Sequence, residues 1–149
     1  MNAIELLRAD HRRVKNLFTQ VERAESWSDK KRALKIIRHE LDVHMMIEET
    51  VLYPMFQSKQ EFKDQINEAF DEHQEAKSLL LELEKIGDNE NEFENTFEEL
   101  VEAVEHHVQE EEDELFPKIQ KTLSVAQIEE IGVQLEQAKK SFESKQQAA

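Results

Sequence analysis

The feature that most constrains this chain is a pair of motifs in which a histidine precedes a glutamate by four residues. His44 and Glu48 form the first motif, and His107 and Glu111 repeat it sixty-three residues later. The chain's only two prolines follow these histidines at the same distance of ten residues. Residues four apart lie on one face of an α-helix, about 6 Å apart along its axis. The repeat therefore predicts two related helices, each presenting an imidazole beside a carboxylate, an arrangement that can chelate or bridge metal ions.

The composition favours helices over strands. The 149 residues include only two glycines and two prolines, and Glu, Gln, Lys, Leu and Ala are frequent. This length suits one domain with a core of its own. The sequence has no cysteine, which excludes disulfides, thiolate metal sites and a cysteine nucleophile. We expect an all-α protein.

Apolar residues recur every three or four positions in four long segments, as in amphipathic helices. We expect these helices to begin near Asn2, within residues 26–29, which offer several cap oxygens, at a capping box that starts at Ser58, and near Asn89. Pro54 should end or kink the second helix. Short connections between amphipathic helices favour an antiparallel up-down-up-down four-helix bundle, which we expect over residues 1–122.

The repeat extends to the partner helices of the two motifs. Residues 10–15 align with residues 72–77 at an offset of sixty-two, so the bundle should consist of two related helical hairpins. Residues 123–143 carry apolar residues at helical spacing after a capping box at Ser124, and predict an amphipathic fifth helix. That helix should pack on the outside of the bundle or against a partner. Residues 144–149 have no apolar pattern and are expected to fray.

The helical period separates the six histidines into two sets. Four of them fall on the core-facing stripes, together with two glutamates, and these inward groups are His11, His44, Glu48, His73, His107 and Glu111. The other two, His39 and His106, have no counterpart in the repeat and face away from these stripes, which predicts surface positions, with His106 a candidate to contact the inward set from outside.

Six buried polar groups need compensation. A buried ionised group without a partner costs several kcal/mol, whereas a whole domain retains about 5 to 15 kcal/mol of net stability. Hydrogen bonds between the glutamates and histidines would compensate part of the cost without metal. Two divalent ions would satisfy all six groups, with the glutamates placed to bridge. Mixed imidazole and carboxylate ligands suit iron, manganese or zinc. The Glu-x-x-His motif of ferritin-like proteins is absent from the sequence.

In these residues the chain resembles the hemerythrin-like family, the HHE cation-binding domain. The resemblance covers residues 1 to about 120 and consists of the order His, His-x-x-x-Glu, His, His-x-x-x-Glu, with Leu-Tyr-Pro and Leu-Phe-Pro after the two motifs. It implies a non-haem di-iron centre in an antiparallel four-helix bundle, with two iron ions joined by an oxo or hydroxo bridge. Zinc or manganese would be the less favoured occupants.

The resemblance assigns the iron ligands residue by residue. They are His11, His44, Glu48, His73, His107 and Glu111. Oxygen carriers of the family have a further histidine one turn after the third-helix ligand, and here that position is Lys77. The four-His, two-Glu set is similar to that of branches implicated in iron sensing, peroxide handling, or nitric-oxide and iron-centre repair. The missing histidine argues against reversible oxygen carriage and predicts an open coordination position near Lys77.

We therefore expect a di-iron protein that binds O₂ or a related small ligand, such as peroxide or nitric oxide, in a sensing, storage or detoxifying role. A peroxidase-like or catalase-like enzyme and an iron-centre repair protein are alternatives. A third alternative is an interaction module that uses zinc or no metal and docks through its fifth helix. The pattern leaves the oligomeric state open.

Charge and hydropathy narrow the other partners. A net charge of -15 argues against binding a nucleic-acid backbone, which requires a basic surface. No apolar run approaches the roughly 18 to 20 residues of a membrane span. Residues 1–5 lack both the basic start and the apolar block of a signal peptide. We expect a cytoplasmic protein without nucleic-acid or membrane partners.

Overall fold

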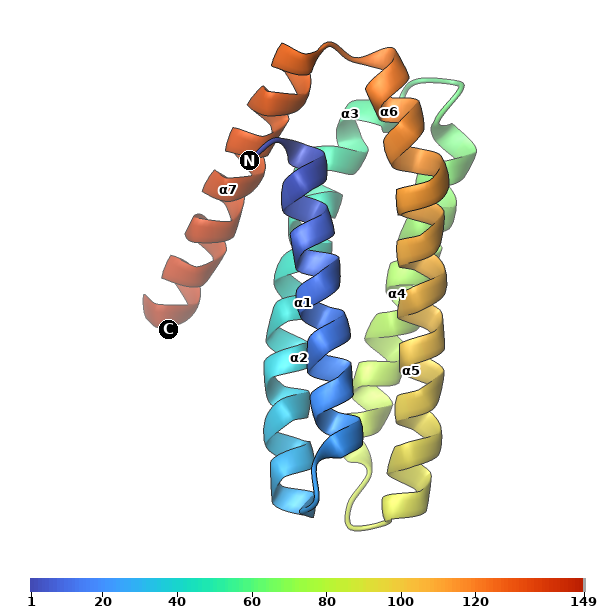
Figure 1. Cartoon of the computed structure of the whole chain (residues 1–149), viewed down its shortest axis with the longest axis vertical. Helices are drawn as coiled ribbons and strands as arrows, with labels where there is room; N and C mark the ends of the chain where they lie inside the picture. Colours follow the sequence, from blue (N-terminus) through green and yellow to red (C-terminus); the bar gives the residue numbers. More distant parts are fainter. Residues whose placement is uncertain (149) are drawn as a thin grey trace.

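The computed structural model describes residues 1–148 and has the expected all-α architecture. Four long helices form an antiparallel bundle of two hairpins, α1 packing against α2 and α4 against α5 (Figure 1). Their bounds are Ala3–Arg23 for α1, Trp27–Ile47 for α2, Lys63–Lys85 for α4 and Glu90–Glu110 for α5. Each hairpin has a turn between its two helices, and both of these turns lie at the same end of the bundle (Figure 1). The predicted four-helix bundle is confirmed.

Three of the four predicted caps are present. The side chains of Asn2, Ser26 and Asn89 each accept a hydrogen bond from the backbone N–H three residues later, at 2.9 to 3.1 Å. The cap predicted at Ser58 is wrong, because α4 begins after Phe62 without a side-chain cap. Phe62 is fully buried, and the centroid of its ring lies 4.7 Å from that of Phe56. α4 thus begins beside a buried aromatic ring and not at the capping box.

Each motif helix passes into a π-helical segment at its glutamate. These segments are η1, Glu48–Leu52, and η2, Glu111–Leu115, followed by the short helices α3, Tyr53–Gln57, and α6, Phe116–Thr122. Pro54 does not end the helical run, because α3 follows η1 directly and contains Pro54 in its first turn. π-Helical turns are rare and frequently occur at functional sites. Both copies of the repeat have one directly at the glutamate.

The fifth helix, α7, Val125–Ala148, lies outside the bundle and packs against α1, α2 and η1 (Figure 1). Its Ile128, Ile131 and Leu135 are buried in the same apolar cluster as the start of α1. Gly132 permits the close approach, because a Cβ atom there would lie 2.5 Å from the carbonyl oxygen of Met1. Residues 144–148, for which the sequence suggested a frayed tail, continue α7, and residue 149 lies outside the described residues.

The six predicted inward groups lie between two apolar clusters. The first cluster fills the end of the bundle near α3 and α6 and includes Leu7, Tyr53, Ile66 and Phe116. The second fills the end near the hairpin turns and includes Phe18, Leu41, Leu80 and Leu100. On each bundle helix the inward polar residues fall between residues of the two clusters. The polar groups therefore lie in a largely apolar interior. Within residues 1–148, no helix is long and apolar enough to cross a membrane.

Candidate metal centre

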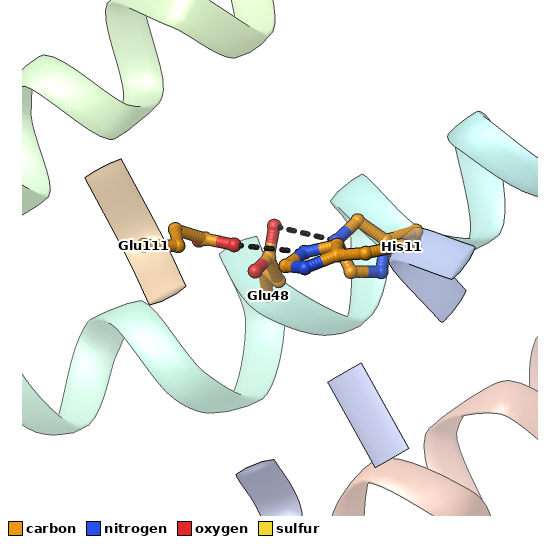
Figure 2. Close-up of side chains that lie close together, drawn as sticks. His11, Glu48 and Glu111 are labelled. Atoms are coloured by element: carbon orange, nitrogen blue, oxygen red, sulfur yellow. Dashed lines mark hydrogen bonds and ion pairs between the residues drawn. The ribbon is translucent and has the colours of Figure 1, made fainter. Parts of the chain in front are cut away.

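The structure brings all six predicted residues together in two adjoining groups. All six are buried, with at most 7% of each residue exposed. Figure 2 shows His11, Glu48 and Glu111 pointing toward one another from different elements. Within each group, one donor atom per residue lies within 4.8 Å of the others, and the groups are His11, His44, Glu48 and Glu111, and Glu48, His73 and His107. Glu48 belongs to both groups and can bridge two ions.

The Nε2 atoms of the histidines lie close to the two carboxylates. Glu48 Oε1 is 3.3 Å from the Nε2 of His44 and 3.1 Å from that of His73. Glu111 Oε1 is 3.2 Å from His11 Nε2, and its Oε2 is 3.4 Å from His107 Nε2. Each carboxylate therefore meets imidazoles from two different helices. This is the arrangement expected of carboxylates shared between two cations.

Two of these buried donor atoms have no hydrogen-bond partner among the described residues. They are His44 Nε2 and Glu48 Oε2. His44 Nε2 is 3.3 Å from Glu48 Oε1, but the contact lacks hydrogen-bond geometry. A buried polar atom without a partner costs about 1 to 3 kcal/mol, so folded proteins seldom leave one without a reason. A cation bound by both atoms would remove that cost, and the donor set fits a divalent metal.

An outer ring of carboxylates orients the four imidazoles. Each of the four inward histidines places its Nδ1 against one carboxylate oxygen. The pairs are His11 with Glu112 at 2.7 Å, His44 with Asp10 at 3.1 Å, His73 with Glu49 at 2.7 Å, and His107 with Glu72 at 2.7 Å. A carboxylate on the outer nitrogen of a metal-binding histidine fixes the ring and its tautomer, which leaves Nε2 free to bind metal.

The four carboxylates of this outer ring occupy equivalent positions in the two halves of the repeat. Asp10 and Glu72 precede the first histidine of each half, and each reaches the motif histidine of its own hairpin. Glu49 and Glu112 follow the two motif glutamates, and each reaches the first histidine of the other hairpin. The sequence analysis did not predict this ring. Its signal was available, because acidic residues occupy these flanking positions in both halves.

A basic group contacts each outer carboxylate in turn. Lys139 Nζ lies 2.6 Å from Asp10, Lys77 Nζ 3.1 Å from Glu49, and Arg8 Nε 4.0 Å from Glu112, while His106 Nε2 lies 3.5 Å from Glu72. Lys77, which occupies the position of the oxygen carriers' extra histidine, is thus directed at an outer carboxylate. It supplies no donor to either inner group.

Tyr53 brings a hydroxyl into the centre that the sequence analysis missed. The hydroxyl can donate to Glu111 Oε2 at 2.5 Å or to Glu48 Oε1 at 3.1 Å, and it lies 3.3 Å from the Nε2 of His73. Burial and the charges of Glu111 and Glu48 raise the pKa of Tyr53 well above its usual value. The phenol therefore keeps its proton in the metal-free site.

The equivalent residue in the other half is Phe116. Its ring stacks on that of His11, with 5.9 Å between the centroids and 3° between the planes. The contrast between Leu-Tyr-Pro and Leu-Phe-Pro in the repeat was the signal for Tyr53. As a result, the two halves differ chemically, because one contributes a hydroxyl that contacts members of both donor groups and the other contributes an apolar ring.

The metal-free centre attracts positive charge. Burial alone would lower the pKa of His44, but the charge of Glu48 and the hydrogen bond with Asp10 raise it to about 10. Burial would likewise lower the pKa of His107, but the charge of Glu111 outweighs it and raises this pKa well above its usual value. His44 and His107 therefore hold a proton near neutral pH in the absence of metal. Bound cations would displace these protons.

The match to a known family agrees with this geometry. Residues 2–119 match the family model of the Hemerythrin HHE cation binding domain. The chain belongs to this hemerythrin family. The match covers the four helices of the bundle and all six inward residues.

Relatives and a solved structure extend the comparison. The hemerythrin-like chain is 31% identical over 145 residues to a DNA nickase of Nostoc sp., covering 97% of this chain and 41% of that protein. It is 28% identical over 133 residues to an uncharacterized hemerythrin-like protein of Schizosaccharomyces pombe, covering 88% of this chain and 66% of that one. The chain thus spans less than two thirds of either relative. A crystal structure of a hemerythrin HHE cation-binding domain protein from Mycobacterium kansasii superposes with a TM-score of 0.79 at 26% identity, covering 95% of this chain and 89% of that chain.

The two remaining histidines of this hemerythrin-like chain lie outside the centre, as predicted. The ring of His39 is 6.3 Å from that of Phe142 on α7. The His106 side chain is 65% exposed and contacts Glu110 at 2.9 Å as well as Glu72. His106 thereby forms a surface cluster with Glu68, Glu72 and Glu110. Its contact with Glu72 agrees with the expectation that it lies near the inward set.

A small cavity adjoins the hemerythrin-like centre on the side of the second apolar cluster. Its volume is about 20 Å³. The four inward histidines and Glu72 line it, together with apolar residues that include Val14, Leu41, Met45, Ala76 and Val104. A space of this size and mostly apolar lining suits a small molecule and excludes bulky ones.

Proposed function

We propose that the six inward residues hold two iron ions, and that this centre binds O₂, nitric oxide or peroxide in a sensing, storage or detoxifying role. The proposed ligands are His11, His44, Glu48, His73, His107 and Glu111. The observation that carries the proposal is the pair of adjoining donor groups that share Glu48, in which His44 Nε2 and Glu48 Oε2 have no hydrogen-bond partner among the described residues. Family membership supports cation binding within residues 2–119, which include these six.

The donor set supports iron over a structural zinc site. Nitrogen and carboxylate donors without thiolates suit iron and manganese, and also zinc. Structural zinc sites are usually closed four-coordinate cages, often with cysteine ligands, whereas here the two groups share a carboxylate. Iron, when bound, would supply reversible electron transfer and positions for a small ligand.

The chain's own residues would select and hold that ligand. The cavity beside the imidazoles, with its mostly apolar lining, admits a molecule of a few atoms. The Tyr53 hydroxyl can donate a hydrogen bond within the centre, where it now meets Glu111. The outer ring keeps the imidazole Nε2 atoms directed inward while the ligand enters and leaves.

Turnover of peroxide is the second candidate, and Tyr53 favours it. Peroxide cleavage requires a proton donor close to the reacting oxygens. The Tyr53 hydroxyl lies between two carboxylates and keeps its proton, so it can donate a hydrogen bond to peroxide bound in the centre. The proposal does not include DNA nicking. The name of the Nostoc relative belongs to a protein of which this chain spans 41%, and a net charge of -15 opposes binding to a phosphate backbone.

Anaerobic reconstitution with ferrous iron tests the proposal. We expect two iron ions per chain, and a near-ultraviolet charge-transfer absorption after O₂ or peroxide is added. His44→Ala should abolish the absorption and reduce the iron content, whereas His39→Ala, on the same helix but outside the centre, should leave both unchanged. An iron content well below two per chain, or equal effects of the two substitutions, would contradict the proposal. Continued decomposition of added peroxide, slowed in Tyr53→Phe, would favour the enzyme over simple binding.

A further inference from the structure

The C-terminal helix contacts the candidate centre through a chain of three residues. Lys139, on α7, places its Nζ 2.6 Å from Asp10 Oδ1. The other oxygen of the same carboxylate, Oδ2, lies 3.1 Å from His44 Nδ1. His44 in turn lies in the inner group with His11, Glu48 and Glu111. Helix α7, which packs outside the bundle (Figure 1), is thus connected to the inner group that contains His44.

Among the described residues, the other three outer carboxylates have no such connection to α7. Glu49, Glu72 and Glu112 contact basic groups that the bundle itself provides, on α4, α5 and α1 respectively. These three carboxylates are partly exposed, so water can solvate an oxygen that loses its basic partner. Asp10 is the buried member of the ring, at 7% exposure. Its Oδ1 therefore depends on Lys139.

We propose that Lys139 is a positioning residue for the metal site formed by His11, His44, Glu48 and Glu111, and that docking of α7 is coupled to occupation of this site. The inference rests on the proposed metal-binding function. Without Lys139, Asp10 would keep a buried oxygen without a partner, which favours rotation of the carboxylate toward water. His44 would then lose the hydrogen bond that directs its Nε2 inward. Because coupling between two equilibria is reciprocal, metal at this site also holds α7 in place.

Stepwise titration with ferrous iron, without O₂ and against a competing chelator, tests the positioning role. The variants are Lys139→Met, the conservative Lys139→Arg, and Lys140→Met as an exposed neighbour with the same change of charge. Lys139→Met should weaken the binding of one ion about tenfold, at the lower end of the effect of outer-ligand substitutions, and leave the other ion unchanged. Lys139→Arg should restore most of the affinity, and Lys140→Met should match the wild type.

Amide hydrogen exchange over residues 125–143 tests the coupling separately. In the wild type, metal should slow exchange in α7, and in Lys139→Met this difference should be lost, with circular dichroism confirming that the helices remain. Two ions bound by Lys139→Met with wild-type or higher affinity, or equal effects of Lys139→Met and Lys140→Met, would overturn the inference and leave the proposed function intact. A wild-type chain that binds fewer than two ions would overturn both.

Discussion

Replacing Tyr53 by phenylalanine should destabilise the metal-free protein more than the metal-loaded one. The phenol has one proton to donate, and its shortest contact is to Glu111 at 2.5 Å. A hydrogen bond to a charged group contributes about 1.5 to 3 kcal/mol, so the free energy of unfolding should fall by that amount in the absence of metal. Since 1 kcal/mol shifts the Tm of a domain of this size by about 2 to 4 °C, the Tm should fall by roughly 3 to 12 °C. Metal should reduce the loss, because cations would compensate the carboxylate instead.

Urea unfolding followed by circular dichroism, with and without metal, measures this difference. The dependence of the free energy on urea should not change, because the substitution alters one buried contact and not the surface exposed on unfolding. Thr122→Val is the control, since it removes an exposed hydroxyl that bonds only to its own helix. Its effect should stay within about 0.5 kcal/mol. Equal losses with and without metal in Tyr53→Phe, or a metal-free loss as small as the control's, would refute the reasoning.

Two further predictions concern the attachment of α7 and the charge of the centre. Gly132→Ala should lower the Tm, because the added Cβ would lie 2.5 Å from the carbonyl oxygen of Met1. Gly87→Ala is the control and should leave the Tm unchanged, because no neighbouring atom lies within 4 Å of the Cβ position. Comparable thermal shifts for the two variants would count against the packing of α7 on the N-terminus. In the metal-free protein, the raised pKa of His44 contributes stability that is complete below the unfolded value near 6.5 and is lost as pH rises through about 10. Urea midpoints measured across this range should therefore fall with pH, and a rise would show that protonated His44 does not stabilise the fold.

The helical period was sufficient to predict the fold and the six inward residues. A stripe of residues three and four apart defines one face of a helix, so His11 and His73 could be placed beside the two motifs without knowledge of the packing. Capping is equally local, which explains the success at Ser26 and Asn89. Prediction failed at Ser58, because the helix begins beside a buried aromatic ring and not at the local capping box.

The outer parts of the centre required the three-dimensional structure. Asp10 and Glu72 each precede an inward histidine in sequence, but each contacts a different histidine, on the neighbouring helix. Which histidine that is depends on how the helices pack. The contact of Lys139 with Asp10 joins residues 129 positions apart, and no periodicity predicts it. The π-helical turns at Glu48 and Glu111 are also invisible to an analysis that assumes α-helical spacing throughout.

Anomalous X-ray diffraction at the iron absorption edge, on crystals of protein loaded with ferrous iron, tests the central claim most directly. The account predicts two peaks, one within the group of His11, His44, Glu48 and Glu111, and one among Glu48, His73 and His107. A single peak, or peaks confined to the surface cluster around His106, would contradict it.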